Sequence, residues 1–274
     1  MKSAYIILYR REILKGGLVQ VFLPLKQVIS FKALYLLFRN EGKREKVLDL
    51  LRNPEKVAKA LDGIPREFGR RIDGTILPAG GKIATVGGRV EDQEEPKRGA
   101  TRELLEELCL PQDPPLIEKI LQNLSVVREV KVGNWIGIYY GLDIAAVDKL
   151  NNFDFHKMQA KIQEFELSLK NEAQAENIKE LCSKGSGYEL HFLQWVPLAD
   201  ALQKQECQDK ILKGDQEFMQ DQSKFYAHLL YAMYGIQLNE GYVARVADIV
   251  FKYLIKEPND ALLDSLKALQ QKLH

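Results

Sequence analysis

Three glutamates within one short segment carry the clearest chemical signal in this 274-residue sequence. Glu103, Glu106 and Glu107 are spaced i, i+3 and i+4, so a helix would bring their carboxylates to one side. Residues 88–110 hold seven acids against four bases, a local charge of −3. A hard divalent cation with oxygen ligands would compensate this charge. A solvated acidic helix face is the alternative that the spacing alone leaves open.

Two glycines, Gly87 and Gly88, stand just before this segment. They predict a tight backbone turn that brings a carbonyl oxygen next to the helix face. A metal held by carboxylates and one carbonyl, with positions open for water and phosphate oxygens, suits the cleavage of a pyrophosphate. A carboxylate within reach of the attacking water would act as the general base.

The segment 88–110 resembles the Nudix box, G-x5-E-x7-R-E-U-x-E-E-x-G-U, in which U is aliphatic. The matching residues are Gly88, Glu94, Arg102, Glu103, Leu104, Glu106, Glu107 and Leu110. The segment departs from the pattern once, because Cys109 stands where the pattern has glycine. That position follows the helix, so the departure concerns the local turn more than metal binding.

The resemblance implies a metal site that holds Mg²⁺ or Mn²⁺. Glu106 and Glu107 would be metal ligands, and the carbonyl of Gly87 would join them. Glu103 would be either a further ligand or the general base.

The resemblance also implies supporting residues outside the ligand set. Arg102 would orient Glu103, and Glu94 would support the site. In several branches of the family a distant glutamate contributes as a metal ligand or as the general base, and Glu189 is the best candidate for it here. His191 follows two residues later and is interpreted as a structural histidine.

The implied fold class is α+β, a Nudix-type α/β/α sandwich with a mixed β-sheet. The residue pattern predicts a hairpin at the start of the chain, glycine-rich turns at 80–81 and 87–88, and further strands and helices. The predicted strands are 5–9, 19–25, 83–86, 125–132, 135–144 and 189–196, and the predicted helices near the box are 96–108 and 116–124.

The chain is longer than a compact Nudix core needs, which suggests additions to it. Residues 1–200 are predicted to form the Nudix domain, with helical insertions at about 41–72 and 151–187. Residues 201–274 are predicted to form a helical C-terminal extension, packed on the core or at a dimer interface.

The whole-chain composition is neutral, with 39 Lys and Arg against 38 Asp and Glu. Such a balance disfavours a polyanion-binding protein or an acidic disordered chain, and it provides no DNA-binding signal. Residues 1–40 carry seven basic residues against one acid and are interpreted as a basic-edged sheet face. Three widely spaced cysteines and no stretch long enough for a membrane span favour a cytoplasmic protein without disulfides.

The predicted activity is hydrolysis of a small-molecule nucleotide, a nucleoside diphosphate linked to another moiety. Substrate marks of several Nudix branches are absent, so the sequence does not name the substrate. Trp135, Tyr139 and Tyr140 could stack on a base or alternate as ordinary sheet residues. A second hypothesis is a nucleotide-sensing or protein-binding module with little turnover, and a homodimer is compatible with both.

Overall fold

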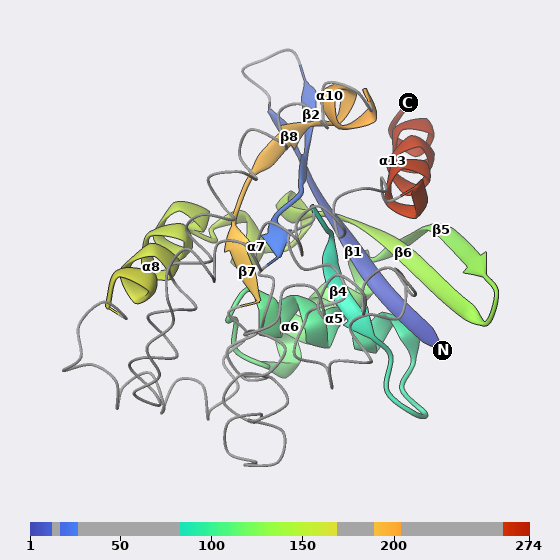
Figure 1. Cartoon of the computed structure of the whole chain (residues 1–274), viewed down its shortest axis with the longest axis horizontal. Helices are drawn as coiled ribbons and strands as arrows, with labels where there is room; N and C mark the ends of the chain where they lie inside the picture. Colours follow the sequence, from blue (N-terminus) through green and yellow to red (C-terminus); the bar gives the residue numbers. More distant parts are fainter. Residues whose placement is uncertain (13–16, 27–82, 169–188, 204–259) are drawn as a thin grey trace, which may run out of the picture.

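The structure of the chain is a computed structural model that describes residues 1–12, 17–26, 83–168, 189–203 and 260–274 (Figure 1). For residues 165–168 only the backbone is described.

Parts of the predicted additions lie outside these residues. The insertion at 41–72 lies outside entirely, as do residues 169–187 of the second insertion and 204–259 of the C-terminal extension. Their separation from a Nudix core therefore stays a prediction.

The strands and helices occur in mixed order along the chain. The strands are β1 (Lys2–Glu12), β2 (Leu18–Phe22), β3 (Leu25–Lys26), β4 (Val86–Arg89), β5 (Ser125–Val132), β6 (Trp135–Asp143), β7 (Leu190–Phe192) and β8 (Trp195–Pro197). The helices are α5 (Pro96–Glu107), α6 (Pro114–Asn123), the short 3-10 helix η2 (Ile144–Ala146), α7 (Asp148–Asn151), α8 (Phe155–Ser168), α10 (Leu198–Leu202) and α13 (Asp260–Leu273).

The larger sheet is mixed and is accompanied by helices, which confirms the predicted α+β class with a mixed sheet. Its described strands run in the order β5-β6-β1-β2-β8, and β4 also pairs with β1. The β1–β6 pair is parallel, whereas the other pairs are antiparallel. Strands β3 and β7 form a separate small sheet. The predicted hairpin is confirmed, since Tyr9 lies opposite Val21 and Glu12 opposite Leu18.

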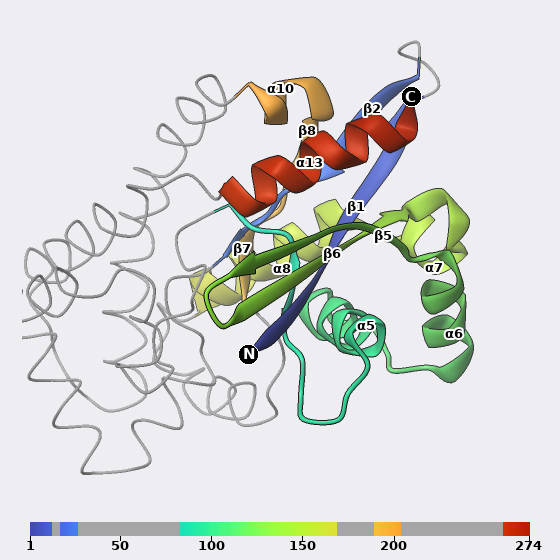
Figure 2. The same cartoon turned by 90° about the vertical axis from the view of Figure 1, so that its right-hand side faces the viewer.

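Helices cover both faces of the larger sheet (Figures 1 and 2). Ile6 and Leu8 of β1 belong to a core that includes residues of α5, α6, α7 and α8. Ile7, between them, belongs to a second core that includes residues of α10 and α13. This division follows from the strand geometry, because successive side chains point to opposite faces.

The predicted strand 189–196 was wrong as one element, because it forms two strands in two sheets. Strand β7 pairs with β3, and β8 pairs with β2. The segment that pairs with residues 190–197 is itself divided into β2 and β3. Pro24 lies between these two strands and has no amide hydrogen to donate. At the break Leu23 donates its backbone N–H to the carbonyl of Gln194, at 3.1 Å.

The glycine turn predicted at residues 87–88 was also wrong. Gly87 and Gly88 lie within β4, opposite Tyr5 and Ala4 of β1. Gly87 has φ +141°, and a Cβ there would lie 2.3 Å from the carbonyl oxygen of Ala4. Glycine is needed for a close approach between strands rather than for a turn.

The predicted helices beside the box agree closely with the structure. Helix α5 ends one residue before the predicted end, and α6 begins two residues earlier than predicted. Pro114 begins α6 instead of preceding it, because a first helical position needs no amide hydrogen. None of the helices in the described ranges is long and apolar enough to cross a membrane.

Candidate functional site

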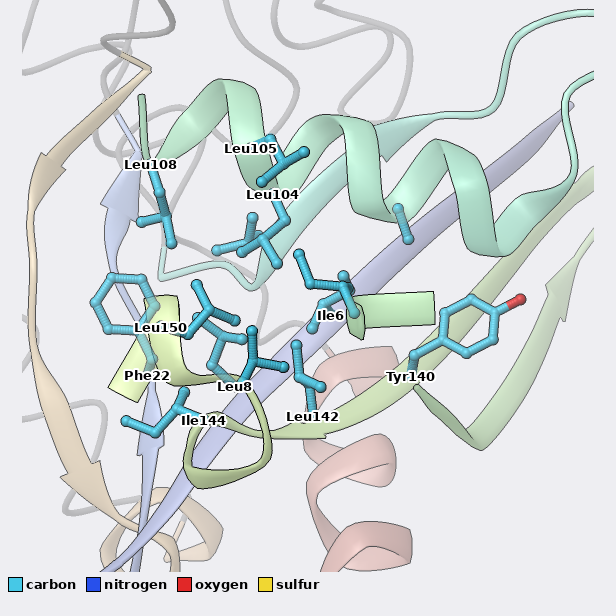
Figure 3. Packing of buried hydrophobic residues seen from close by; sticks show 14 of the residues in the cluster. Ile6, Leu8, Phe22, Leu104, Leu105, Leu108, Tyr140, Leu142, Ile144 and Leu150 are labelled. Carbon is cyan, nitrogen blue, oxygen red and sulfur yellow. The ribbon is translucent and has the colours of Figure 1, made fainter. Parts of the chain in front are cut away.

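The position of the box glutamates depends on the apolar side of helix α5, which is anchored in the core. Pro96 stands in the first turn, where its fixed φ favours the helix. Figure 3 shows Leu104 and Leu108 directed toward the sheet, where Ile6 and Leu8 belong to the same core cluster. Leu104 and Leu108 are 0% and 1% exposed. Burial of this side sets the rotation of the helix, and with it the directions of the glutamates.

Glu107 is the most deeply placed acid of the box, at 1% exposed. Its Oε1 accepts a hydrogen bond from Nζ of Lys26 at 2.6 Å and one from the backbone N–H of Gly87 at 3.3 Å. Its Oε2 is buried without a hydrogen-bond partner among the described residues. Burial raises the pKa of Glu107 to about 7, against the attraction of Lys26.

Among the described residues, three oxygen-bearing groups surround the ammonium of Lys26. Besides Glu107, its Nζ donates to the carbonyl oxygen of Gly87 at 3.2 Å. It also lies 3.9 Å from Oε2 of Glu189. Burial disfavours the charged ammonium, but Glu107 and Glu189 outweigh this and raise the pKa of Lys26 above its usual value. The lysine is therefore a buried cation held by acids.

Arg102 forms a second cation-centred group. Its Nε and Nη2 donate to the two oxygens of Glu94 at 3.1 and 3.2 Å, a bidentate arrangement that fixes both side chains. Its Nη1 donates to Glu103 at 2.8 Å and lies 3.5 Å from Glu106. The hydrogen bond from Arg102 is the main reason that the pKa of Glu94 is lowered.

Two glycines make room for the carboxylates of this second group. A Cβ on Gly88 would lie 2.6 Å from Oε2 of Glu103. A Cβ on Gly99 would lie 2.9 Å from Oε2 of Glu94. Both carboxylates therefore pack against the backbone of a glycine. A larger residue at either glycine would displace the carboxylate.

Glu103 connects the two groups electrostatically. Burial raises its pKa, against a hydrogen bond and attraction from Arg102 and a weaker attraction from Lys26. Its charge in turn adds to the raised pKa of Glu107. The two cation-centred groups thus share one electrostatic environment.

The residues predicted from the sequence fall into these two groups. Around Lys26 lie Gly87, Glu107 and Glu189, and around Arg102 lie Glu94, Glu103 and Glu106. Glu106 is the exposed member, with 44% of its side chain accessible. His191, expected to be structural, is 9% exposed, and its carbonyl accepts from the side chain of Gln159 at 3.0 Å.

The sequence prediction missed Lys26. It lies 81 residues before Glu107 and was included in the basic stretch 1–40, interpreted as a sheet face. One signal pointed toward it, because Arg102 alone cannot neutralise the glutamates of the box. A metal was inferred from that imbalance, whereas a second protein cation was not considered.

The donor types suit Mg²⁺ or Mn²⁺, which bind carboxylate and carbonyl oxygens. The buried and unpartnered Oε2 of Glu107, beside the carbonyl of Gly87, offers an oxygen that a cation would satisfy. Within the described residues, however, no three Asp, Glu, His or Cys side chains converge as a metal-binding group. The carboxylates turn toward Lys26 and Arg102 instead.

The aromatic residues considered for base stacking belong to the sheet. Tyr139 and Tyr140 are 3% and 4% exposed and lie in the two opposite cores. Tyr139 stacks on Tyr5 with ring centroids 5.0 Å apart. Trp135 donates its indole N–H to the hydroxyl of Ser3 at 3.1 Å. Burial leaves neither tyrosine available as a platform for a base.

The chain was compared with family models, curated proteins and solved structures. No family model matches the chain, and no curated protein matches it. The chain is similar to the crystal structure of a mutT/nudix family protein from Listeria innocua, at 14% identity and a TM-score of 0.32. The match covers 80% of this chain and 94% of that one. Similarity at this level does not establish a family.

Proposed function

We propose that the chain is a Nudix-type pyrophosphohydrolase that depends on Mg²⁺ or Mn²⁺. Its substrate would be a nucleoside diphosphate linked to another moiety, cleaved at the diphosphate. The observation that carries the proposal is the buried carboxylate of Glu107 beside the Gly87 carbonyl, with one oxygen unpartnered among the described residues. Glu107 belongs to the segment 88–110, whose spacing matches the Nudix box, and Gly87 immediately precedes that segment.

The proposed ligands are Glu106, Glu107 and the carbonyl of Gly87, with Glu103 as a further ligand or the base. A bound divalent cation would neutralise phosphate charge and lower the pKa of the attacking water. Glu107 is buried, and electrostatic interactions are stronger there than in water.

Two acids are candidates for the general base, which takes a proton as the water oxygen bonds to phosphorus and the bond to the leaving phosphate breaks. Glu103 is the first candidate, because Arg102 holds its carboxylate at 2.8 Å and burial raises its pKa. Glu189 is the second, since it lies beside Lys26 at the same site. Arg102 would position Glu103, and Glu94 would hold Arg102.

The test is phosphate release from a panel of nucleotide derivatives during a Mg²⁺ titration. We expect Glu106→Gln to lower kcat/KM by about 100-fold or more, because it removes a charged ligand from an exposed position without disturbing the core. Glu129→Gln, the same change at an exposed position of β5, is the control and should leave activity unchanged. Near-normal activity of the Glu106 variant would contradict the proposed role.

A nucleotide-sensing module with little turnover is the second candidate. The observation in its favour is the pairing of Lys26 and Arg102 with the acids, which leaves no convergent metal-binding group in the described part of the chain. Under this alternative the panel would yield no phosphate, while a nucleotide would raise the melting temperature.

A further inference from the structure

Lys26 is placed at the glutamates by the small sheet. Strand β3 pairs with β7, and this pairing sets Lys26 opposite Leu190, the residue after Glu189. Only 9% of the Lys26 side chain is accessible. The ammonium is therefore brought to Glu107 by backbone pairing rather than by a freely rotating surface side chain.

The oxygens around this ammonium are those expected around a metal. In the described part of the chain its closest partners are a carboxylate oxygen of Glu107 at 2.6 Å and the carbonyl oxygen of Gly87 at 3.2 Å, with Glu189 at 3.9 Å. Carboxylate and carbonyl oxygens are also what Mg²⁺ and Mn²⁺ bind. An ammonium and a divalent cation on the same oxygens would repel each other strongly at such distances.

We propose that the Lys26 ammonium and the divalent cation are alternative occupants of one site, so that metal binding displaces Lys26 from Glu107 and Gly87. This inference rests on the proposed function, of which it describes the regulation. Without metal, Lys26 neutralises Glu107 and keeps the site closed. With metal, the lysine must leave, and its departure lowers the apparent affinity for the metal.

Calorimetric titration with Mn²⁺ tests the competition without measuring turnover. We expect Lys26→Met and Lys26→Gln to bind Mn²⁺ at least about tenfold more tightly than the unaltered chain, because the competing charge is gone. Lys267→Met, at an exposed position of α13, is the matched control and should bind as the unaltered chain does. Equal or weaker binding by both Lys26 variants would overturn the competition.

Thermal unfolding provides a second readout on the same proteins. The metal-free Lys26 variants should melt lower than the unaltered chain, since Glu107 loses its counter-ion. Mn²⁺ should therefore raise their melting temperature more than it raises that of the unaltered chain. An equal rise in all three proteins would count against the proposal.

Chemical labelling of the unaltered chain covers the case in which the variants do not fold. Reductive methylation followed by mass spectrometry should show Lys26 protected without metal and modified at saturating Mg²⁺, while Lys267 is modified equally in both. Unchanged protection of Lys26 would overturn its displacement.

The outcomes separate this proposal from the proposed function. Tighter Mn²⁺ binding by the Lys26 variants, with no turnover of any nucleotide, would support the competition and contradict the hydrolase. Turnover of a nucleotide by the unaltered chain, with unchanged Mn²⁺ affinity in the Lys26 variants, would support the hydrolase and contradict the competition.

Discussion

Cys109 occupies the position at which the Nudix pattern has glycine, and its backbone shows why glycine suits it. Its φ is +52°, in the left-handed region that L-residues rarely adopt. The helix end is closed there by two hydrogen bonds, from Cys109 N–H to the carbonyl of Glu106 and from Leu110 N–H to that of Leu105. This Schellman arrangement requires a left-handed residue after the helix. Cys109 differs from the glycine of the Nudix pattern, but its backbone adopts the left-handed conformation that favours glycine.

We predict that Cys109→Gly raises the free energy of unfolding by about 0.5–1 kcal/mol. The gain is the relief of left-handed strain, less the extra freedom of glycine in the unfolded chain. Urea denaturation followed by tryptophan fluorescence measures it. Cys109→Ala keeps the strain and should change stability by less than about 0.5 kcal/mol. An equal gain for alanine would attribute the effect to removal of the thiol.

At the scale of elements, the site depends on hydrogen bonds between helix α5 and the loop at residues 90–95 that precedes it. Glu94 lies in that loop and receives two hydrogen bonds from Arg102, in the second turn of α5. Oε2 of Glu94 also accepts from the N–H of Glu91 at 2.9 Å. These contacts hold loop and helix together, and the same guanidinium reaches Glu103.

We predict that the hydrogen bonds between Glu94 and Arg102 make the free energy of unfolding depend on pH under acidic conditions. The pKa of Glu94 is lowered in the folded state, so its contribution to stability is present above the usual glutamate pKa of 4.5 and is lost as pH falls below that value. Glu94→Gln should therefore lower the free energy of unfolding by about 2 kcal/mol at pH 7. The difference from the unaltered chain should shrink as pH falls below 4.5.

Urea denaturation from pH 7 down to pH 3 measures this dependence. Glu118→Gln is the control, because Glu118 and its partner Arg98 are each 58% exposed and 3.6 Å apart. Such an exposed pair contributes at most about 1 kcal/mol. A Glu94 difference that stays constant across the pH range would refute the assignment.

At the scale of the whole molecule, the C-terminal end of the chain completes the second core. Helix α13 buries Leu262, Leu266 and Leu269 in the core on the face away from α5 (Figure 2). Arg11 near the end of β1 donates to the carbonyl of Leu273 at 3.5 Å. The first strand and the last helix therefore contribute side chains to the same core, although they lie far apart in the sequence.

We predict that Leu266→Ala lowers the free energy of unfolding by about 3 kcal/mol, because its side chain is 2% exposed and leaves a cavity. Lys267→Ala, the next residue and 56% exposed, should cost less than about 0.5 kcal/mol. Urea denaturation of both variants measures the difference. Equal effects would mean that α13 contributes little to the core.

The sequence by itself determined the features that depend on local geometry. Pro96 at a first helical position and the prolines after residue 110 predicted a helix over 96–108, and α5 lies within one residue of those bounds. The strand-like runs at 125–132 and 135–144 were predicted as well, and β5 and β6 match them closely. Such signals are confined to a few neighbouring residues, so they can be recognised in the sequence without knowing which distant segments pack against them.

Only the tertiary structure decided which distant residues meet. It divided residues 189–196 between two sheets, placed Gly87 inside a strand, and brought Lys26 to Glu107 across 81 positions. Sheet pairing controls all three outcomes, and pairing is a long-range contact that no local period encodes. The sequence therefore indicated that the glutamates need a cation, and the fold supplied a lysine at Glu107.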